Sequence, residues 1–423
     1  MTALPRHLLP DHAVVGADGR LSVAGCDLID LAERFGTPLF VYDEDHLRAR
    51  CREAVAAFGD GVAYAAKAFL CTAMARLAHE EGLHIDVASG GELFVVLAAG
   101  VPADRIVLHG NNKSVEELQG ALDAGVGRIV VDSFDEMDRI EALVAAGAPV
   151  PKVLVRVTPG IEAHTHEYIR TGQQDSKFGF GLGSGDAAAA VIRASGSDAM
   201  ELVGVHAHIG SQVFVADFFA EAIEVLAPFV APLGLPELSI GGGLGVPYVV
   251  GESAPTITDW AKAVHQACAE AGLVARPVAE PGRAIVAQAA LTLYRVGTVK
   301  EVPSVRTYVA VDGGMIDNPR PALYGSGYEA FLPRATLAER PRTVTVVGKH
   351  CESGDVLVRD AAVPADLVVG DVLATPVTGA YGHSMGSNYN KLPRPPVVFC
   401  RDGDARLVVR RETYEDLLRA DLA

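Results

Sequence analysis

A single lysine in an apolar stretch is the first residue of this chain whose type and position could do chemistry. Residues 62–71 read VAYAAKAFLC, and Lys67 is the only charged residue among them. Burying an ammonium group without a partner is costly, and a desolvated lysine becomes a good amine nucleophile. Two interpretations stay open at this point. Lys67 is a nucleophile, or an inward carboxylate such as Asp86 neutralises its charge.

Further polar residues gather where the predicted strands end. The enzymes built on parallel barrels carry their chemistry at the carboxyl ends of the strands. Polar residues scattered through a core would not collect at one end of successive strands. The residues that do so here are Lys67, Asp86, Ser89, His109, Asn111, Asn112, Asp132, Arg156, His206, His208, Ser211, Glu280 and Arg283.

Two short glycine loops could hold a phosphate group. GGGLG at 241–245 and EPGR at 280–283 each follow a predicted strand directly. Exposed N–H groups in such loops bind phosphate, and the last two strands of a barrel are the usual place for it. The dinucleotide pattern is excluded because Val246 stands where it needs glycine. A phosphate loop, Lys67 and the carboxylate of Glu280 fit pyridoxal 5'-phosphate (PLP), which offers an aldehyde, a phosphate and a basic ring nitrogen.

Eight β-like runs alternate with Ala-rich helical segments over about 240 residues, as in a (β/α)8 barrel. The runs are nearly continuous and apolar, as expected of strands covered on both faces. A doubly wound open sheet is the competing architecture, and the count of eight favours the barrel. We predict strands at 62–68, 83–89, 105–110, 128–133, 152–160, 202–211, 237–243 and 277–283. One intervening helix begins with Ser114 and Glu117, the pattern of a capping box.

After about residue 290 the helical pattern stops. Seven β-like runs follow with turn residues between them, which predicts an antiparallel β domain. The first 40 residues also contain short β-like pieces. We therefore predict three parts: an N-terminal segment at 1–40 that joins the β domain, a barrel at 41–290 that binds PLP, and the β domain at 291–423.

Composition limits the partners of the chain. The 423 residues carry a formal charge of -17, which disfavours nucleic acid and anionic membranes. No apolar run approaches the roughly 20 residues of a membrane span, and the N-terminus does not resemble a signal peptide. The six cysteines form no CxxC pair, and His164 and His166 are poor candidates for metal ligands. We expect a cytoplasmic enzyme with a small-molecule substrate and no metal.

Nine motifs in one order resemble the fold-type III PLP-dependent decarboxylases, and among these the diaminopimelate decarboxylases. The likeness covers nearly the whole chain. The motifs are YAAKAF (64–69), DVASGGEL (86–93), HGNNKS (109–114), TPGIEAHTHEYIRTG with DSKFG (158–179), HIGSQ (208–212), GGGLG with EPGR (241–283), NPRPALYG (318–325), CESGD (351–355) and GAYGHSMGSNYN (379–390).

The resemblance implies a role for each matching residue. Lys67 forms the Schiff base with PLP, and Cys351 returns a proton to the substrate. The implied cofactor-binding residues are Lys67, Asp86, His208, Ser211, Gly242, Gly243, Glu280, Gly282, Arg283 and Tyr381. The implied substrate-binding residues are Arg283, Arg320, Tyr324, Glu352 and Tyr381. The CESGD loop of one subunit completes the site of its partner, which implies a homodimer.

The implied reaction is decarboxylation of meso-2,6-diaminopimelate to L-lysine, the last step of lysine biosynthesis. Arginine grips carboxylates with two parallel hydrogen bonds, which suits a substrate with two carboxylates. Two segments depart from the family pattern: position 383 is His where an aromatic residue is common, Gly386 stands where Ser is common, and YGSGYEAF (324–331) is altered. These leave open a related decarboxylase for a larger or carrier-linked amino acid. A racemase and a non-catalytic PLP-binding regulator are less favoured alternatives.

Overall fold

The computed structural model describes residues 4–160 and 176–422, and these pack into two units. The larger unit comprises residues 50–246 and 254–284, and the smaller one comprises 1–49, 247–253 and 285–423. None of the helices in the described ranges is both long and apolar enough to span a bilayer. The domain boundaries predicted at 40/41 and 290/291 stay a prediction.

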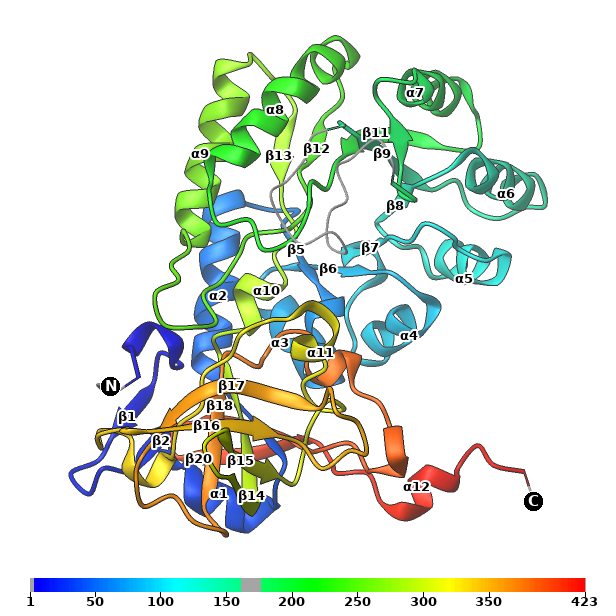
Figure 1. Cartoon of the computed structure of the whole chain (residues 1–423). Helices are drawn as coiled ribbons and strands as arrows, with labels where there is room; N and C mark the ends of the chain where they lie inside the picture. Colours follow the sequence, from blue (N-terminus) through cyan, green and yellow to red (C-terminus); the bar gives the residue numbers. More distant parts are fainter. Residues whose placement is uncertain (1–3, 161–175, 423) are drawn as a thin grey trace. The chain divides into compact units, whose positions relative to one another are not determined.

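The larger unit is a parallel barrel (Figure 1). Its strands pair in the order β13-β12-β11-β9-β8-β7-β6-β5. Backbone bonds from Ala63 to Ala279 and from Ala65 to Pro281 join β5 to the chain that follows β13, so the sheet nearly closes. The strands are β5 (Ala63–Ala65), β6 (His84–Val87), β7 (Ile106–Leu108), β8 (Arg128–Val131), β9 (Lys152–Thr158), β11 (Glu201–His206), β12 (Glu237–Ser239) and β13 (Arg276–Val278), with the short β10 (Phe180–Gly181) beside β9.

All eight predicted strands are present, and the barrel is confirmed over the open sheet. Most predicted strands extend beyond the observed ones at their carboxyl ends. The predicted strand at 237–243, for example, continues four residues past Ser239, where β12 ends. Those extra residues leave the sheet and form the loops of the site. Apolar side chains from five strands fill the barrel interior, so its centre is a packed core: Ala63, Val107, Val130, Leu154 and Val203.

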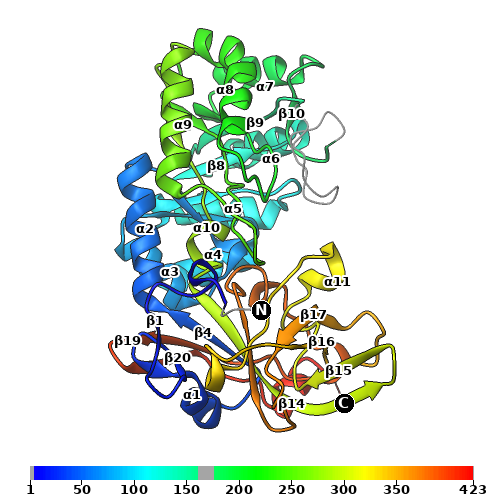
Figure 2. The same ribbon diagram turned by 60° about the vertical axis from the view of Figure 1, so that its left-hand side comes forward.

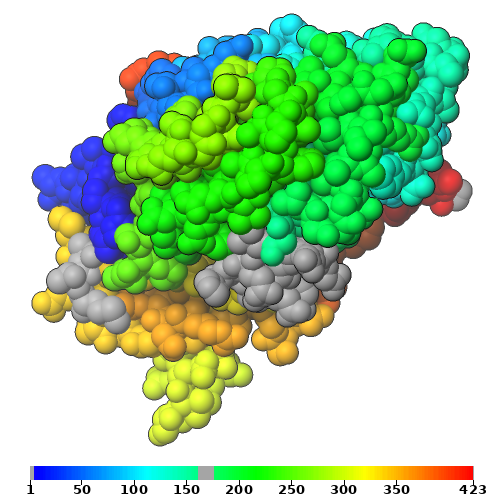
Figure 3. All heavy atoms as spheres, turned by 90° about the horizontal axis from the view of Figure 1, so that it is seen from above, coloured from blue at the N-terminus to red at the C-terminus, as the bar shows by residue number. Residues whose placement is uncertain are grey.

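Helices cover the outside of the barrel. Among them, α8 and α9 lie side by side on the surface (Figures 1 and 3), with the rings of Phe219 and Trp260 5.0 Å apart. The predicted capping box opens α5, where Ser114 and Glu117 each bond the other's backbone N–H. The helices are α2 (Glu44–Phe58), α3 (Thr72–Glu80), α4 (Gly90–Ala98), α5 (Val115–Ala124), α6 (Phe134–Ala145), α7 (Asp186–Gly196), α8 (Asp217–Val230), α9 (Ile257–Glu270) and α10 (Arg283–Val286).

The smaller unit is built on a mostly antiparallel sheet in the order β17-β16-β15-β14-β4-β19-β20, with β18 also paired to β14. The long β14 turns into a hairpin with β15 (Figure 2). The strands are β4 (Leu39–Asp43), β14 (Ala290–Val302), β15 (Arg306–Val311), β16 (Arg342–Val347), β17 (Val356–Val363), β18 (Val372–Pro376), β19 (Val397–Arg401) and β20 (Asp404–Val409). The seven runs predicted after residue 290 are all strands.

The N-terminal residues add a small sheet to this unit. It consists of β1 (Ala13–Val15), β2 (Leu21–Val23) and β3 (Cys26–Asp27). The Asp27 side chain then accepts hydrogen bonds from the first turn of α1 (Leu28–Phe35) and so caps that helix. The remaining helices of the unit are short: α11 (Arg320–Tyr324) and α12 (Tyr414–Leu418).

Candidate active site

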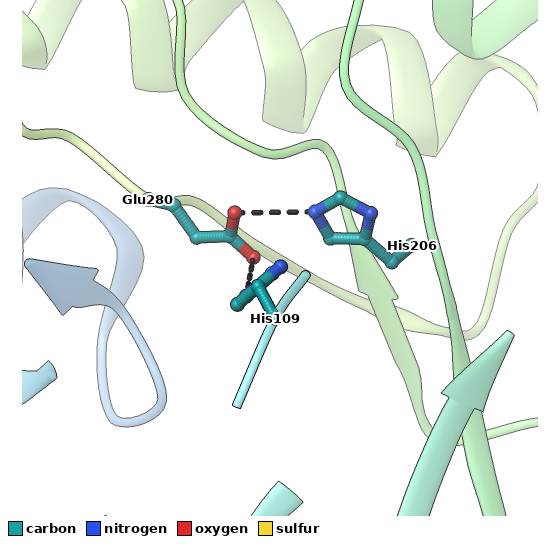
Figure 4. A group of neighbouring side chains, drawn as sticks. All are labelled: His109, His206 and Glu280. Carbon is teal, nitrogen blue, oxygen red and sulfur yellow. Dashed lines mark hydrogen bonds and ion pairs between the residues drawn. The ribbon is translucent and has the colours of Figure 1, made fainter. Parts of the chain in front are cut away.

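Glu280 is the centre of the polar cluster inside the barrel (Figure 4). It follows β13, and its carboxylate accepts a hydrogen bond of 2.7 Å from the Ser239 hydroxyl and one of 3.1 Å from Nε2 of His206. Nε2 of His109 lies 3.6 Å from Oε1 of Glu280, the oxygen that accepts from Ser239. The three side chains come from the ends of β13, β11 and β7, and they are all buried. These three polar residues at strand ends therefore lie close together, as predicted.

The surroundings of Glu280 favour its charged form. Burial opposes the charge, but the attraction of His206 and His109 and the bonds from His206 and Ser239 outweigh it and hold the pKa of Glu280 well below its ordinary value. The neighbouring Asp86 shows the opposite behaviour. Burial and the repulsion of Glu280 raise the pKa of Asp86 well above its ordinary value. The surroundings thus favour the charged form of Glu280 and disfavour that of Asp86.

Burial also opposes the charged form of two histidines in the site, His109 and His208. Burial lowers the pKa of His109 well below its ordinary value. Burial also lowers the pKa of His208, and the charge of Lys67 adds to the effect. Sequence analysis placed His208 in the site and named His109 only as a polar strand end. Ligand atoms of His109, His206 and Glu280 lie within 4.8 Å of one another, a spacing that would also suit a metal ion.

Lys67 lies in the short 3-10 helix Ala66–Ala68, directly after β5. The expected burial of Lys67 is wrong, because the strand ends at Ala65 and the lysine side chain is exposed. No described residue forms a hydrogen bond or ion pair with Lys67. Asp86 therefore does not neutralise Lys67 through a direct ion pair. Lys67 still lies within electrostatic range of Asp86, Glu92 and His208.

The glycine loops pack tightly against neighbouring backbone, and their role in holding a phosphate stays a prediction. A Cβ on Gly242 would lie 2.4 Å from the carbonyl oxygen of Glu280, and one on Gly243 would lie 2.4 Å from that of Gly210. Gly243 also has a φ of +117°, which side-chain-bearing residues rarely adopt. Only glycine allows the backbone to pass this close to its neighbours.

A buried arginine lies at the second loop. Gly282 leaves no room for a Cβ, which would meet the side chain and the carbonyl oxygen of Ala65 at 2.9 Å. Arg283 follows it, is buried, and donates to the Ser211 hydroxyl at 3.1 Å. The structure thus brings the HIGSQ and EPGR motifs together.

A second set of predicted residues lies in the smaller unit. Arg320 begins α11 and is buried, with Nη1 donating to the Tyr328 hydroxyl at 2.8 Å and the guanidinium carbon 4.3 Å from the centre of the Tyr248 ring. Tyr324 ends the same helix. Tyr381 has a φ of +62°, a strained conformation that often marks functional sites. Cys351 and Glu352 form the exposed tip of the CESGD loop.

The two segments that depart from the family pattern make defined local contacts. Burial lowers the pKa of His383 to about 4, and its neutral ring packs edge-on against Phe40, so it replaces an aromatic residue without adding charge. A Cβ on Gly386 would lie 3.0 Å from the carbonyl oxygen of His383. In the altered segment 324–331, Tyr328 is the residue that bonds Arg320.

Several site residues were missed by sequence reasoning. His206 was named only as a polar strand end, with no role assigned to it. It is buried, and its partner is Glu280. Ser239 gave no signal other than a hydroxyl at the end of an apolar strand. Tyr248 and Tyr328 are aromatic residues whose proximity to Arg320 only the fold reveals. The motif TPGIEAHTHEYIRTG and the two histidines in it fall largely outside the described residues.

Comparison with known proteins agrees with this geometry. Residues 44–287 match the family of the pyridoxal-dependent decarboxylase, pyridoxal binding domain. The chain is 49% identical to diaminopimelate decarboxylase of Mycobacterium tuberculosis, over 96% of this chain and 95% of the relative, and 46% identical to that of Bacillus subtilis, over 96% and 95%. Its fold matches the crystal structure of diaminopimelate decarboxylase from M. jannaschii with L-lysine, with a TM-score of 0.90, 35% identity and 98% coverage of both chains. The chain belongs to the diaminopimelate decarboxylase family of PLP-dependent decarboxylases.

Proposed function

We propose that this enzyme removes one carboxylate from meso-2,6-diaminopimelate to give L-lysine and carbon dioxide. The bond between the amine-bearing carbon and its carboxylate breaks, carbon dioxide leaves, and a proton is added to that carbon. The similarity over nearly the full length to diaminopimelate decarboxylases supports this substrate. So does the match to a structure of that enzyme with L-lysine, which would be the product.

The residues around Glu280 fit PLP, the cofactor of this family. Arg283 and Ser211 place a cation and a hydroxyl beside glycine loops that no larger residue could form, which suits a phosphate group. A carboxylate held in its charged form suits the ring nitrogen, and the neutral imidazole of His208 suits a ring face. When bound, PLP withdraws electrons from the carbon that loses its carboxylate.

The residues of this chain then divide the work. Glu280 would keep a proton on the ring nitrogen, because an ionised carboxylate at that place stabilises the positive charge. His206 and Ser239 orient Glu280 through the bonds described above. Lys67, exposed and without a bonded partner among the described residues, would hold the cofactor through its amine. Asp86 remains a proposed cofactor neighbour, and burial disfavours its charged form.

In the smaller unit, Arg320 is the proposed anchor for the distal carboxylate of the substrate. In the larger unit, Arg283 stays a proposed substrate contact. The Tyr328 hydroxyl and the Tyr248 ring fix the guanidinium of Arg320, and a preorganised fork loses less freedom on binding. Tyr324, Tyr381 and Glu352 are the further proposed substrate contacts, and Cys351 is the proposed proton donor.

The active enzyme is proposed to be a homodimer in which the CESGD loop of one chain completes the site of the other. The support is the family likeness of this loop and its exposed tip at Cys351–Gly354. A cytoplasmic location stays a prediction. A decarboxylase for a larger or carrier-linked amino acid stays the alternative, and the altered segments at 324–331 and 379–390 are where its substrate specificity would differ.

The test is lysine and carbon dioxide formation from meso-diaminopimelate by the purified protein loaded with PLP. The wild type should form both in equal amounts, and Lys67→Ala should form neither while still folding. Light scattering of the same sample should give twice the chain mass of 44.3 kDa. Bound PLP without lysine formation would overturn the substrate, and a monomeric active enzyme would overturn the dimer.

A further inference from the structure

The CESGD loop has a fixed base and an exposed tip. At the base, the buried Asp355 carboxylate accepts hydrogen bonds from the backbone N–H of His350 at 3.0 Å, from Nδ1 of His350 at 2.8 Å and from the N–H of Met315 at 2.7 Å. At the tip, Cys351 and Glu352 are exposed. The bonds of Asp355 hold the base of the loop but do not reach the thiol of Cys351 or the carboxylate of Glu352.

A dipeptide from a distant part of the chain holds that tip. The side-chain oxygen of Asn390 accepts a hydrogen bond of 3.2 Å from the backbone N–H of Cys351. The Tyr389 hydroxyl donates to the carboxylate of Glu352 at 2.5 Å. The Tyr389 ring also stacks on the ring of His350, with centroids 6.0 Å apart and planes 14° from parallel. Two successive residues thus contact three successive residues of the loop.

The backbone of this dipeptide is suited to the task. Asn390 has a φ of +53° and a ψ of +23°, in the left-handed region where asparagine is several-fold enriched over other side chains. An alanine there would be strained, and a glycine would fit the backbone but offer no acceptor. Asparagine both tolerates this backbone conformation and offers an acceptor oxygen. Tyr389 supplies a donor to the carboxylate of Glu352, and this hydrogen bond raises the pKa of the Tyr389 hydroxyl.

We propose that Tyr389 and Asn390 are positioning residues of the decarboxylation. Asn390 sets the backbone at Cys351 and thereby the direction of the thiol, and Tyr389 sets the carboxylate of Glu352. The inference rests on the proposed function for the roles of those two residues. The five contacting residues belong to one chain, so these contacts stay together wherever the loop acts. In a dimer with shared sites, Tyr389 and Asn390 serve the site of the partner.

The experiment compares Tyr389→Phe and Asn390→Gly with matched controls. Tyr414→Phe removes a hydroxyl from an exposed tyrosine of the same unit, and Asn390→Asp keeps an acceptor oxygen in a residue that tolerates the left-handed backbone. Each variant is measured in two ways. The first is the rate at which iodoacetamide alkylates Cys351, followed by mass spectrometry without substrate. The second is kcat and KM for meso-diaminopimelate.

The expected pattern separates the two residues. Asn390→Gly should change the alkylation rate of Cys351 at least roughly threefold and lower kcat by roughly tenfold, the scale of one lost hydrogen bond. Tyr389→Phe should mainly raise KM, by roughly tenfold, because a hydrogen bond to a charged group is lost. Tyr414→Phe should match the wild type, and Asn390→Asp should stay within roughly threefold of it.

A double variant excludes a merely structural role. If Tyr389 acts through Glu352, then Tyr389→Phe should add little to the KM of a Glu352→Gln enzyme, because residues that share one contact are not additive. Full additivity would overturn the assignment of Tyr389. Unchanged alkylation in Asn390→Gly, or changed alkylation with wild-type kcat, would overturn that of Asn390. If the wild type formed no lysine, the proposed function would fail, and the alkylation rates would still decide whether Asn390 places the thiol.

Discussion

Two lysines that follow different strands of the barrel have opposite environments. Lys67 follows β5, is exposed, and forms no hydrogen bond or ion pair with a described residue. Lys113 lies in the loop after β7 and is 2% exposed. Its ammonium donates to the carbonyl oxygens of Gly110 and Val130, at 2.7 Å each, and to the carboxylate of Glu136 at 2.8 Å. All three hydrogen atoms of Lys113 are therefore used within the fold.

The difference shows how one residue type serves two purposes. A buried charge must be paired and fully bonded, and the Lys113–Glu136 pair meets that condition. Glu136 also accepts from the backbone N–H of Asp132 at 3.1 Å, so the pair ties the loop after β7 to the loop after β8. A lysine without such partners keeps its amine available for a reaction. The environment, rather than the lysine itself, separates a structural from a chemical role.

Replacing Lys67 should give the largest effect. Lys67→Met removes the amine, and decarboxylation should fall by about four orders of magnitude or more, as when other covalent nucleophiles are lost. The stability should be unchanged, because the side chain is exposed and unbonded. Lysine formation and thermal unfolding of the same preparation check the two halves of this prediction. A strongly destabilised Lys67→Met protein would contradict the contrast between the two lysines.

The same substitution at the second lysine should do the reverse. Lys113→Met leaves the carboxylate of Glu136 buried without its cation, and the free energy of unfolding should drop by about 3–5 kcal/mol. Urea denaturation followed by circular dichroism measures the loss. The decarboxylation rate per folded molecule should change far less than in Lys67→Met. A loss of stability below about 0.5 kcal/mol would place Lys113 among ordinary surface residues.

Neutralising the partner should restore part of that stability. In Lys113→Met with Glu136→Gln, no buried charge remains, and the glutamine oxygen can still accept from the N–H of Asp132. We expect about 3 kcal/mol of the loss to return, since most of the cost lies in the unpaired charge. The double variant and both single variants, unfolded in urea under one condition, give the coupling energy. Equal stability of Lys113→Met and the double variant would mean that the unpaired charge is not the cause.

The sequence predicted the barrel that carries both lysines, but not which of the two is buried. The period of strands and helices was enough to place eight strands and the antiparallel unit, because it reports which faces are covered. It also placed Lys67 and Glu280 at strand ends. It could not tell that Lys67 leaves the strand and becomes exposed while Lys113, quoted only within a motif, is buried. Side-chain partners such as His206 and Ser239 on Glu280 depend on the register between strands, which no local pattern carries.

A buried carboxyl group in the smaller unit differs from Glu136 in having no ion-pair partner among the described residues. Asp317 is 1% exposed, accepts from the N–H of Gly314 at 2.9 Å, and forms no ion pair with any described residue. Burial raises its pKa from 3.8 to about 7. Below pH 3.8 the group is protonated in both states, so it costs nothing there. Between pH 3.8 and about 7 the unfolded chain ionises and the folded one does not, so stability falls as the pH rises through this window.

Asp317→Asn should therefore flatten the pH dependence of stability. The amide keeps an acceptor oxygen for Gly314 but cannot ionise. From pH 5 to pH 8 the wild type should lose about 2–3 kcal/mol relative to the variant, at about 1.4 kcal/mol for each pH unit below the folded pKa. Urea denaturation of both proteins at the two pH values measures the difference. If the two proteins keep the same stability difference at pH 5 and pH 8, Asp317 is not the titrating group. A gain for the wild type on raising the pH would mean that a cation pairs with Asp317 after all, as Glu136 pairs with Lys113.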